Sequence, residues 1–248
     1  MKKAIFNWSG GKDSSLTLYQ VMQKKEFDIQ CLLTSVNTKY RRISMHGVRE
    51  ELLEAQAKSI GLPLHKIMVP EMPTMETYND LMRQTLQQFT KDGVEYSIFG
   101  DIFLEDLKKY REEQLAKVNI KGVFPIWKVP TTQLVKEFIE LGFKAVLVCV
   151  NERYLDQSFA GREIDQNFLK DLPKNVDPCG ENGEYHSFVY AGPIFKKPIA
   201  FKKGEVVYRN YKPAACPPDT SSNDRYSQHS SKQDVDTGFW YCDLLSGA

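Results

Sequence analysis

Cysteine is sparse in this chain, and neither sign of charge is in excess. The five cysteines among 248 residues lie far apart and form no CxxC pair, which argues against a disulfide framework and a structural zinc knuckle. The 33 basic residues almost balance the 32 acidic ones, so composition gives no reason to expect a protein that coats nucleic acid or an anionic membrane. A nucleic-acid partner is therefore disfavoured.

Long apolar runs are missing as well. No stretch reaches the roughly eighteen consecutive apolar residues of a membrane-spanning helix, and the run after Met1-Lys2-Lys3 is too short for a signal-peptide core. We expect no membrane partner, and the unpaired cysteines fit a reducing compartment. The sequence thus predicts a soluble, cytoplasmic protein, and it leaves a homodimer open.

The patterning of the apolar residues predicts an α/β fold. They make up 42% of the chain, ample for a buried core. In the first hundred residues, short apolar runs alternate with longer segments of helical period, as strands and helices do in a parallel sheet. The predicted strands are 4–8, 29–37, 64–69 and 96–99, and the predicted helices are 13–23, 48–60 and 78–89.

The texture of the sequence changes after Asp101. Helices are predicted over 105–117 and 132–141, and short strands over 145–150, 187–190 and 206–209. We divide the chain into an α/β domain over 1–105, a smaller α+β domain over 106–212, and a tail over 213–248. Most of the tail is too polar to order itself. Its apolar end, 238–245, is expected to dock as a strand or plug.

A glycine-rich loop follows the first predicted strand, where an open parallel sheet binds ligands. Its residues are Ser9, Gly10, Gly11, Lys12, Asp13, Ser14 and Ser15. Adjacent glycines let consecutive N–H groups point into one concavity suited to phosphate oxygens, and the lysine, the hydroxyls and the helix N-terminus add further attraction. The spacing is neither Walker A nor GxGxxG. An ordinary Gly-Gly turn before a helix is the plain alternative.

The segment Ser9-Gly10-Gly11-Lys12-Asp13-Ser14 resembles the signature of the PP-loop (N-type) ATP pyrophosphatases. Three further blocks resemble one branch of that superfamily, the diphthine–ammonia ligase family and its uncharacterised bacterial and archaeal relatives. They are Met45-His46-Gly47, Phe99-Gly100-Asp101-Ile102 and Cys179-Gly180-Glu181-Asn182-Gly183-Glu184-Tyr185. The resemblance runs from about residue 3 to residue 200 and implies a HUP-type ATP-binding domain, here residues 1–105.

The blocks around His46 and around Asp101 contain candidate site residues. Gly100 and Asp101 close a predicted strand level with the glycine loop, so Gly100 is a candidate nucleotide contact and Asp101 could hold Mg²⁺ or orient the attacking group. A helix N-cap is the alternative for Asp101. His46 is a candidate nucleotide contact, or a surface residue.

The block around Glu181 and the charged helix predicted over 105–117 supply the remaining candidates. Glu181 and Glu184 would be costly to bury for stability alone, and as catalytic groups they could bind ammonium, take its proton or hold a metal. An exposed acidic turn is the alternative. The neighbouring candidate substrate contacts are Gly180 and Gly183, together with Tyr110 and Arg111 from the charged helix, where a guanidinium could chelate an oxyanion.

The resemblance implies a ligase in which Lys12 and the loop bind ATP with Mg²⁺. A carboxylate is adenylated and ammonia then displaces AMP, after release of pyrophosphate, to give an amide. The carboxylate would belong to a small molecule or to a protein, such as diphthine on elongation factor 2. Two other classes stay open: a tRNA-modifying PP-loop enzyme that adenylates a base, and a non-catalytic ATP-binding HUP protein.

Overall fold

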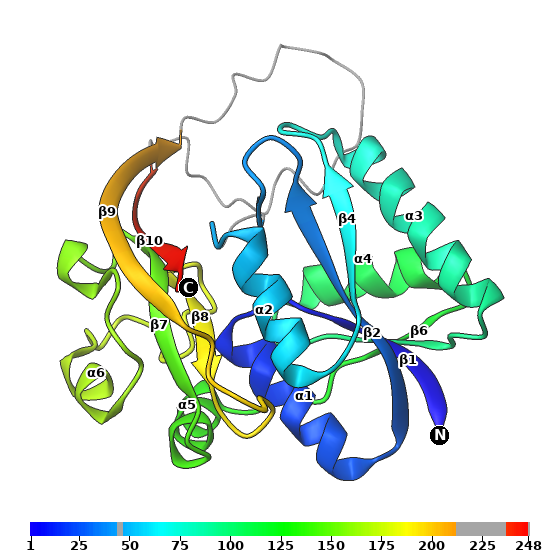
Figure 1. Cartoon of the computed structure of the whole chain (residues 1–248), viewed down its shortest axis with the longest axis horizontal. Coiled ribbons are helices and arrows are strands. Elements are labelled where there is room, and N and C mark those ends of the chain that lie inside the picture. Colours follow the sequence, from blue (N-terminus) through cyan, green and yellow to red (C-terminus); the bar gives the residue numbers. More distant parts are fainter. Residues whose placement is uncertain (44–46, 212–236, 248) are drawn as a thin grey trace.

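The computed structural model describes residues 1–43, 47–211 and 237–247. The predictions for Met45, for His46 and for the polar stretch 213–236 lie outside the described residues. The described chain forms two β-sheets that lie side by side, with helices between them and on the far side of the first sheet (Figure 1). The predicted α/β class is confirmed.

The first sheet has six strands, most of them parallel. They are β1 (Lys2–Asn7), β2 (Phe27–Asn37), β3 (Arg42–Ile43), β4 (Leu64–Val69), β5 (Tyr96–Ile98) and β6 (Lys121–Val123). β1 pairs in parallel with β2 and β5, β4 with β2, and β6 with β5, whereas the short β3 runs antiparallel. Phe6 lies opposite Ile98, which lies opposite Val123, so these strands deliver the segments that follow them to one edge of the sheet.

The first structural unit is longer than the sequence predicts. The charged helix α4 (Glu105–Ala116) follows β5 and leads into β6, and β6 is hydrogen-bonded to β5 in the first sheet. The boundary predicted near residue 105 therefore moves to the stretch between β6 and α5 (Thr131–Glu140). A strand of only three residues, Lys121–Val123, gives too little alternation to be recognised from sequence.

Helices bury both faces of the first sheet. Three of them are α1 (Lys12–Lys24), α2 (Glu50–Ile60) and α3 (Met75–Lys91). Along β1, Ala4 and Phe6 enter a core shared with α1, α2 and the second sheet, whereas Ile5 enters a core shared with α3 and α4. This two-sided burial explains why β1 is a continuous apolar run rather than an alternating one.

The second sheet is antiparallel, in the order β8-β7-β10-β9. Its strands are β7 (Lys144–Asn151), β8 (Tyr185–Ala191), β9 (Phe201–Tyr211) and β10 (Thr237–Ser246), and it is accompanied by η1 (Gln157–Phe159) and α6 (Gln166–Asp171). The apolar end of the chain docks as β10, an interior strand, as predicted. Asp243 on β10 accepts hydrogen bonds from Arg42 at 2.9 Å and from Arg49 at 2.7 Å. Residues 237–246 thus belong to the second sheet and not to a separate tail.

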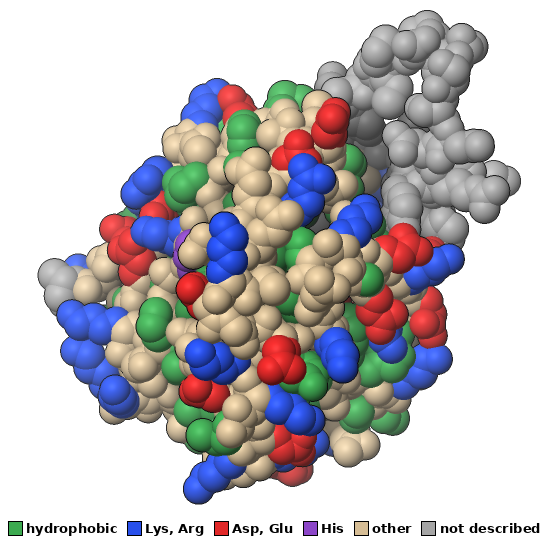
Figure 2. Space-filling model, turned by 90° about the vertical axis from the view of Figure 1, so that its right-hand side faces the viewer, with side chains coloured by type: hydrophobic (Ala, Val, Ile, Leu, Met, Phe, Trp, Pro, Cys, Tyr) green, Lys and Arg blue, Asp and Glu red, His purple; other side chains and the backbone are tan. Residues whose placement is uncertain are grey.

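The surface seen in Figure 2 carries basic and acidic side chains interspersed with one another. This mixture agrees with the near-neutral composition of the chain. Within the part of the chain that the structure describes, no helix combines the length and the apolar character needed to cross a bilayer.

Candidate functional site

The glycine loop (residues 9–15) comprises the turn after β1 and the first residues of α1, and its shape requires glycine at position 10. Gly10 has φ +75°, a left-handed conformation that side chains rarely adopt. A Cβ atom at Gly10 would also lie 2.7 Å from Oε1 of Gln56, a buried residue of α2. Position and composition of the loop thus agree with the sequence prediction.

Serine hydroxyls tie the loop to itself. The Gly11 amide donates to Ser9 Oγ at 3.2 Å, Ser9 Oγ lies 3.0 Å from Ser14 Oγ, and Ser14 Oγ donates to the Gly11 carbonyl at 3.0 Å. Ser15 is fully buried, and no described residue forms a hydrogen bond with its Oγ. A buried hydroxyl without a partner costs about 1–3 kcal/mol.

Lys12 and Asp13 form a buried ion pair at the start of α1. Lys12 is only 4% exposed, and its Nζ lies 2.7 Å from Asp13 Oδ2. Burial lowers the pKa of Lys12, but Asp13, followed by Cys179, Tyr185 and Glu181, together outweigh burial and raise that pKa well above its ordinary value. The aromatic ring of Tyr185 lies 5.5 Å from the same ammonium. The predicted cation of the loop is thus present, and its charge is shared with a carboxylate.

Gly100 and Asp101 follow β5 and reach the loop from its neighbour in the sheet. A Cβ atom at Gly100 would lie 3.0 Å from the Ser14 amide nitrogen and 3.1 Å from the Asp13 carbonyl oxygen, so glycine permits close backbone packing there. Asp101 pairs with Nε of Arg111 on α4 at 2.7 Å. Burial raises the pKa of Asp101, while Arg111 opposes that shift.

The structure brings together two of the predicted site residues, Asp101 and Arg111. The carboxylate expected to hold a metal and the guanidinium expected to chelate substrate bind each other, and Arg111 also lies 4.5 Å from the centre of the Phe99 ring. Among the described residues, no group of three His, Cys, Asp or Glu side chains gathers as a metal site. Tyr110, a predicted substrate contact, donates a hydrogen bond to Asn79 on α3 instead.

The acidic loop (residues 177–184) leads into β8, and Glu184 holds it in shape. Glu184 is fully buried. Its carboxylate accepts hydrogen bonds from the Asp177 amide at 3.0 Å and from the Asn182 amide at 2.8 Å. Gly180 and Gly183, predicted to contact substrate, have φ of +72° and +82° and shape the turn. Both oxygens of Glu184 thus bind backbone amides of the loop, and its catalytic role stays a prediction.

Glu181 differs from Glu184 in exposure and in electrostatics. Its side chain is only partly buried. Burial, followed by the negative charge of Asp13, raises the pKa of Glu181 to about 8, whereas Lys12 opposes this shift and Asp177 and Asp101 add to it. Glu181 therefore shares one electrostatic environment with the glycine loop and with the end of β5. A carboxyl group with such a pKa can exchange protons near neutral pH.

The strand β8 binds the glycine loop directly. The Lys12 amide donates to Ser187 Oγ at 3.1 Å, and the Val189 amide donates to the Gly10 carbonyl at 2.9 Å. Gln56 Nε2 donates to the carbonyls of Gly10 at 3.0 Å and Val189 at 2.6 Å. The second unit thus completes the N-terminus of α1, and both loops are attached to one frame.

Sequence reasoning missed three residues that hold the two loops in place, namely Gln56, Asp177 and Ser187. Gln56 carried a signal, since it is a polar residue within the apolar stripe of its predicted helix. Asp177 starts an Asp-Pro pair that favours a turn. Ser187 carried no signal, because its partner Lys12 lies 175 residues away.

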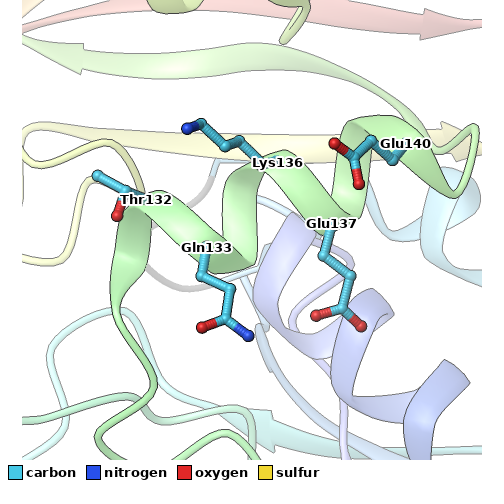
Figure 3. A pocket seen from close by; sticks show the side chains of 5 residues that line it. All are labelled: Thr132, Gln133, Lys136, Glu137 and Glu140. Atoms are coloured by element: carbon cyan, nitrogen blue, oxygen red, sulfur yellow. The ribbon is translucent and has the colours of Figure 1, made fainter.

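Two other features can be set apart from the site. Cys179 is 2% exposed, its thiol donates to the Thr131 carbonyl at 3.4 Å, and burial raises its pKa far above the ordinary value, so it is not an activated nucleophile. An open surface groove runs along α5, where Gln133 and Glu137 project toward α1 (Figure 3). Gln20 of α1 donates to Glu137 at 2.9 Å, and the groove includes no residue of either loop.

Family models match both halves of the chain. The model of the diphthamide synthase N-terminal domain matches residues 1–121, and that of the diphthamide synthase C-terminal domain matches residues 130–213. The chain belongs to the diphthamide synthase family. Its N-terminal domain carries the glycine loop with Asp101, its C-terminal domain carries the acidic loop, and the contacts of β8 join the two.

Curated relatives agree with this membership and confirm the resemblance to diphthine–ammonia ligases. Diphthine–ammonia ligase of Bos taurus is 33% identical over 184 residues, which cover 68% of this chain and 67% of the relative. The Homo sapiens protein of that name is 28% identical over the same coverage, and the Danio rerio protein is 25% identical over 80% of this chain and 86% of the relative. This family membership supports the prediction that the chain is an ATP-dependent ligase.

Solved structures give more distant matches. One is described as a predicted subunit of tRNA methyltransferase from Methanocaldococcus jannaschii, at 17% identity, with a TM-score of 0.40 and coverage of 80% of this chain and 100% of that one. Another is a U34-tRNA thiolase from Methanococcus maripaludis with a [4Fe-4S] cluster, at 17% identity, with a TM-score of 0.36 and coverage of 57% and 58%.

Proposed function

We propose that this protein adenylates a carboxylate with ATP and then forms an amide with ammonia, releasing pyrophosphate and AMP. The observation that carries the proposal is the attachment of the acidic loop to the glycine loop through β8, with Ser187 Oγ 3.1 Å from the Lys12 amide. One loop has the chemistry to hold an anionic leaving group, and the other has a carboxyl group that exchanges protons near neutral pH.

In the first step, a carboxylate oxygen attacks the α-phosphorus of ATP and the bond to the β-phosphate oxygen breaks. The glycine loop and the N-terminus of α1 stabilise the departing pyrophosphate, because fixed N–H dipoles need no reorganisation as charge develops. Lys12 adds a positive charge that Asp13 partly neutralises. Ser15 contributes the hydroxyl that has no partner among the described residues.

In the second step, the nitrogen of ammonia attacks the activated carbonyl carbon and the bond to AMP breaks. The nitrogen loses a proton, and Glu181 accepts it. A base works best when its pKa lies near the working pH, and the pKa of Glu181 is raised to about 8 by burial and by Asp13. Glu184 acts on this step only through the shape of the acidic loop.

The acceptor that we propose is a protein-borne carboxylate, diphthine, as the names of the curated relatives indicate for those proteins. We propose Mg²⁺ as a partner of ATP, held mainly by phosphate and water oxygens, which suit that ion. Among the described residues no three His, Cys, Asp or Glu side chains gather as a metal site, so the protein would supply one or two ligands at most, with Asp101 as the candidate.

The stoichiometry of the three products tests this proposal. The full chain is incubated with ATP, ammonium and elongation factor 2 that bears diphthine, and AMP, pyrophosphate and the new amide are counted. We expect one of each per turnover, and no pyrophosphate when elongation factor 2 lacks diphthine. Pyrophosphate release that depends on tRNA instead, or ATP binding without any turnover, would overturn the proposal.

A further inference from the structure

Asp177 supports the acidic loop at the point where the loop presents Glu181. Its Oδ1 accepts hydrogen bonds from the Cys179 amide at 2.8 Å and from the Glu181 amide at 3.3 Å. Its Oδ2 accepts a hydrogen bond from the Thr131 hydroxyl at 2.7 Å. One carboxylate therefore joins the acidic loop to the first residue of α5, and it contacts the backbone of the proposed base itself.

A second carboxylate fixes Asp177 in turn. The Asp177 amide donates to Glu184 Oε1 at 3.0 Å, and the Glu184 carbonyl accepts a hydrogen bond from the Asn151 amide of β7 at 2.8 Å. Glu181 is thus connected through Asp177 and Glu184 to the interior of the second sheet. Such a chain restricts the backbone of Glu181 while its side chain stays partly exposed.

The charge of Asp177 also acts on the site. It raises the pKa of Asp13, Cys179, Glu181 and Tyr185, in each case as a contribution smaller than that of burial. The groups that act on Glu181 come from both units: Asp13 and Lys12 from α1, Asp101 from the end of β5, and Asp177 from the acidic loop. Lys12 favours the charged carboxylate, and the three aspartates oppose it.

We propose that Asp177 is a positioning residue for Glu181, which holds the backbone of the base in place and keeps a negative charge beside it. The inference rests on the proposed function, since it assumes that Glu181 accepts the proton in amide formation. Asp177 itself touches neither substrate nor nucleotide in this account. Its effect on the reaction passes entirely through Glu181.

The variant Asp177→Asn separates charge from geometry. An asparagine oxygen can still accept from the amides of Cys179 and Glu181, and its NH₂ group can donate to the Thr131 hydroxyl, because a hydroxyl both donates and accepts. The negative charge is lost. We expect the rising limb of the pH profile of kcat to shift to lower pH, by on the order of half a unit, because a like charge that disfavoured the ionised base is gone.

The measurement is kcat for amide formation between pH 6 and 9, with the KM for ATP at each pH. A midpoint that moves to lower pH with an unchanged KM for ATP supports the proposal. An unmoved midpoint overturns it, even if kcat falls, because a purely structural role would lower kcat at every pH alike.

Two controls keep this result interpretable. Glu181→Gln should abolish amide formation at every pH in this range; if amide formation with the same rising limb persists in that variant, the proposed function fails, whatever Asp177→Asn does. Thr131→Val keeps the carboxylates of Asp177 and Glu181 but removes the hydroxyl that binds Asp177. It should lower kcat severalfold without changing the KM for ATP, and an unchanged kcat would count against the positioning role even if Asp177→Asn did not fold.

Discussion

The glycine loop and the acidic loop both belong to the candidate site, yet the roles of neighbouring residues are divided differently within each loop. In the glycine loop, neighbouring residues are predicted to serve one task, and the left-handed Gly10 lies just before the Lys12–Asp13 ion pair. In the acidic loop, two glutamates three positions apart have opposite tasks. Glu184 is buried and hydrogen-bonded within the loop, and Glu181 is partly exposed with a raised pKa. A motif can therefore indicate which loop matters without indicating which of its carboxylates reacts.

The largest effect is expected from Lys12→Ala in the glycine loop. ATP affinity should fall at least tenfold, and the free energy of unfolding should fall by about 3 kcal/mol, because the variant leaves Asp13 without its partner in a mostly buried site. Nucleotide titration and urea unfolding measure the two effects. In the double variant Lys12→Ala, Asp13→Asn, stability should recover while ATP affinity stays low. Recovery of ATP affinity as well would mean that the lysine only balances the aspartate.

A direct comparison of Glu184→Gln with Glu181→Gln sharpens the contrast within the acidic loop. Glutamine keeps one acceptor oxygen where Glu184 uses two, so one buried amide loses its partner and the free energy of unfolding should drop by about 1–2 kcal/mol. Glu181→Gln should retain wild-type stability or exceed it, yet form no amide. Equal losses of stability in the two variants would remove the distinction that we draw between them.

The pH dependence of stability gives an effect with a definite sign. The pKa of Glu181 is raised from 4.5 to about 8 in the folded protein, so the folded state binds more protons than the unfolded state between those values. The contribution of this group therefore favours folding at low pH and is lost as the pH rises toward 8. Urea unfolding at pH 6 and pH 8 should show a smaller loss in Glu181→Gln than in the wild type. An identical loss would indicate that Glu181 titrates normally.

Most of the fold could be predicted because its signals are local. The strand–loop–helix order of the first sheet and the stop of α2 at the left-handed Gly61 follow from apolar period and turn residues. The docking of β10 was predictable from its apolar composition, but its place between β7 and β9 was not. The pairing of β6 with the first sheet, beyond the boundary predicted near residue 105, could not be predicted because β6 has only three residues and joins that sheet through pairing alone.

The site was predicted less completely, because its polar groups are assigned by contacts across long separations. Asp101 was predicted to bind a metal and Arg111 to bind substrate. In the structure these two side chains, ten residues apart, pair with each other between the end of β5 and α4. Ser187 and Gln56 reach the glycine loop from other elements, and no local pattern links them to it. The two loops could be predicted from the sequence, whereas the hydrogen bonds and ion pairs of their side chains could not.

We propose that the glycine loop activates the carboxylate and that Glu181 acts only afterwards. Exchange of labelled pyrophosphate into ATP tests it most directly, because exchange reports adenylation alone. In Glu181→Gln, with elongation factor 2 bearing diphthine, exchange should continue at a rate near that of the wild type while amide formation is abolished. Loss of exchange together with the amide, or normal amide formation in this variant, would contradict the account.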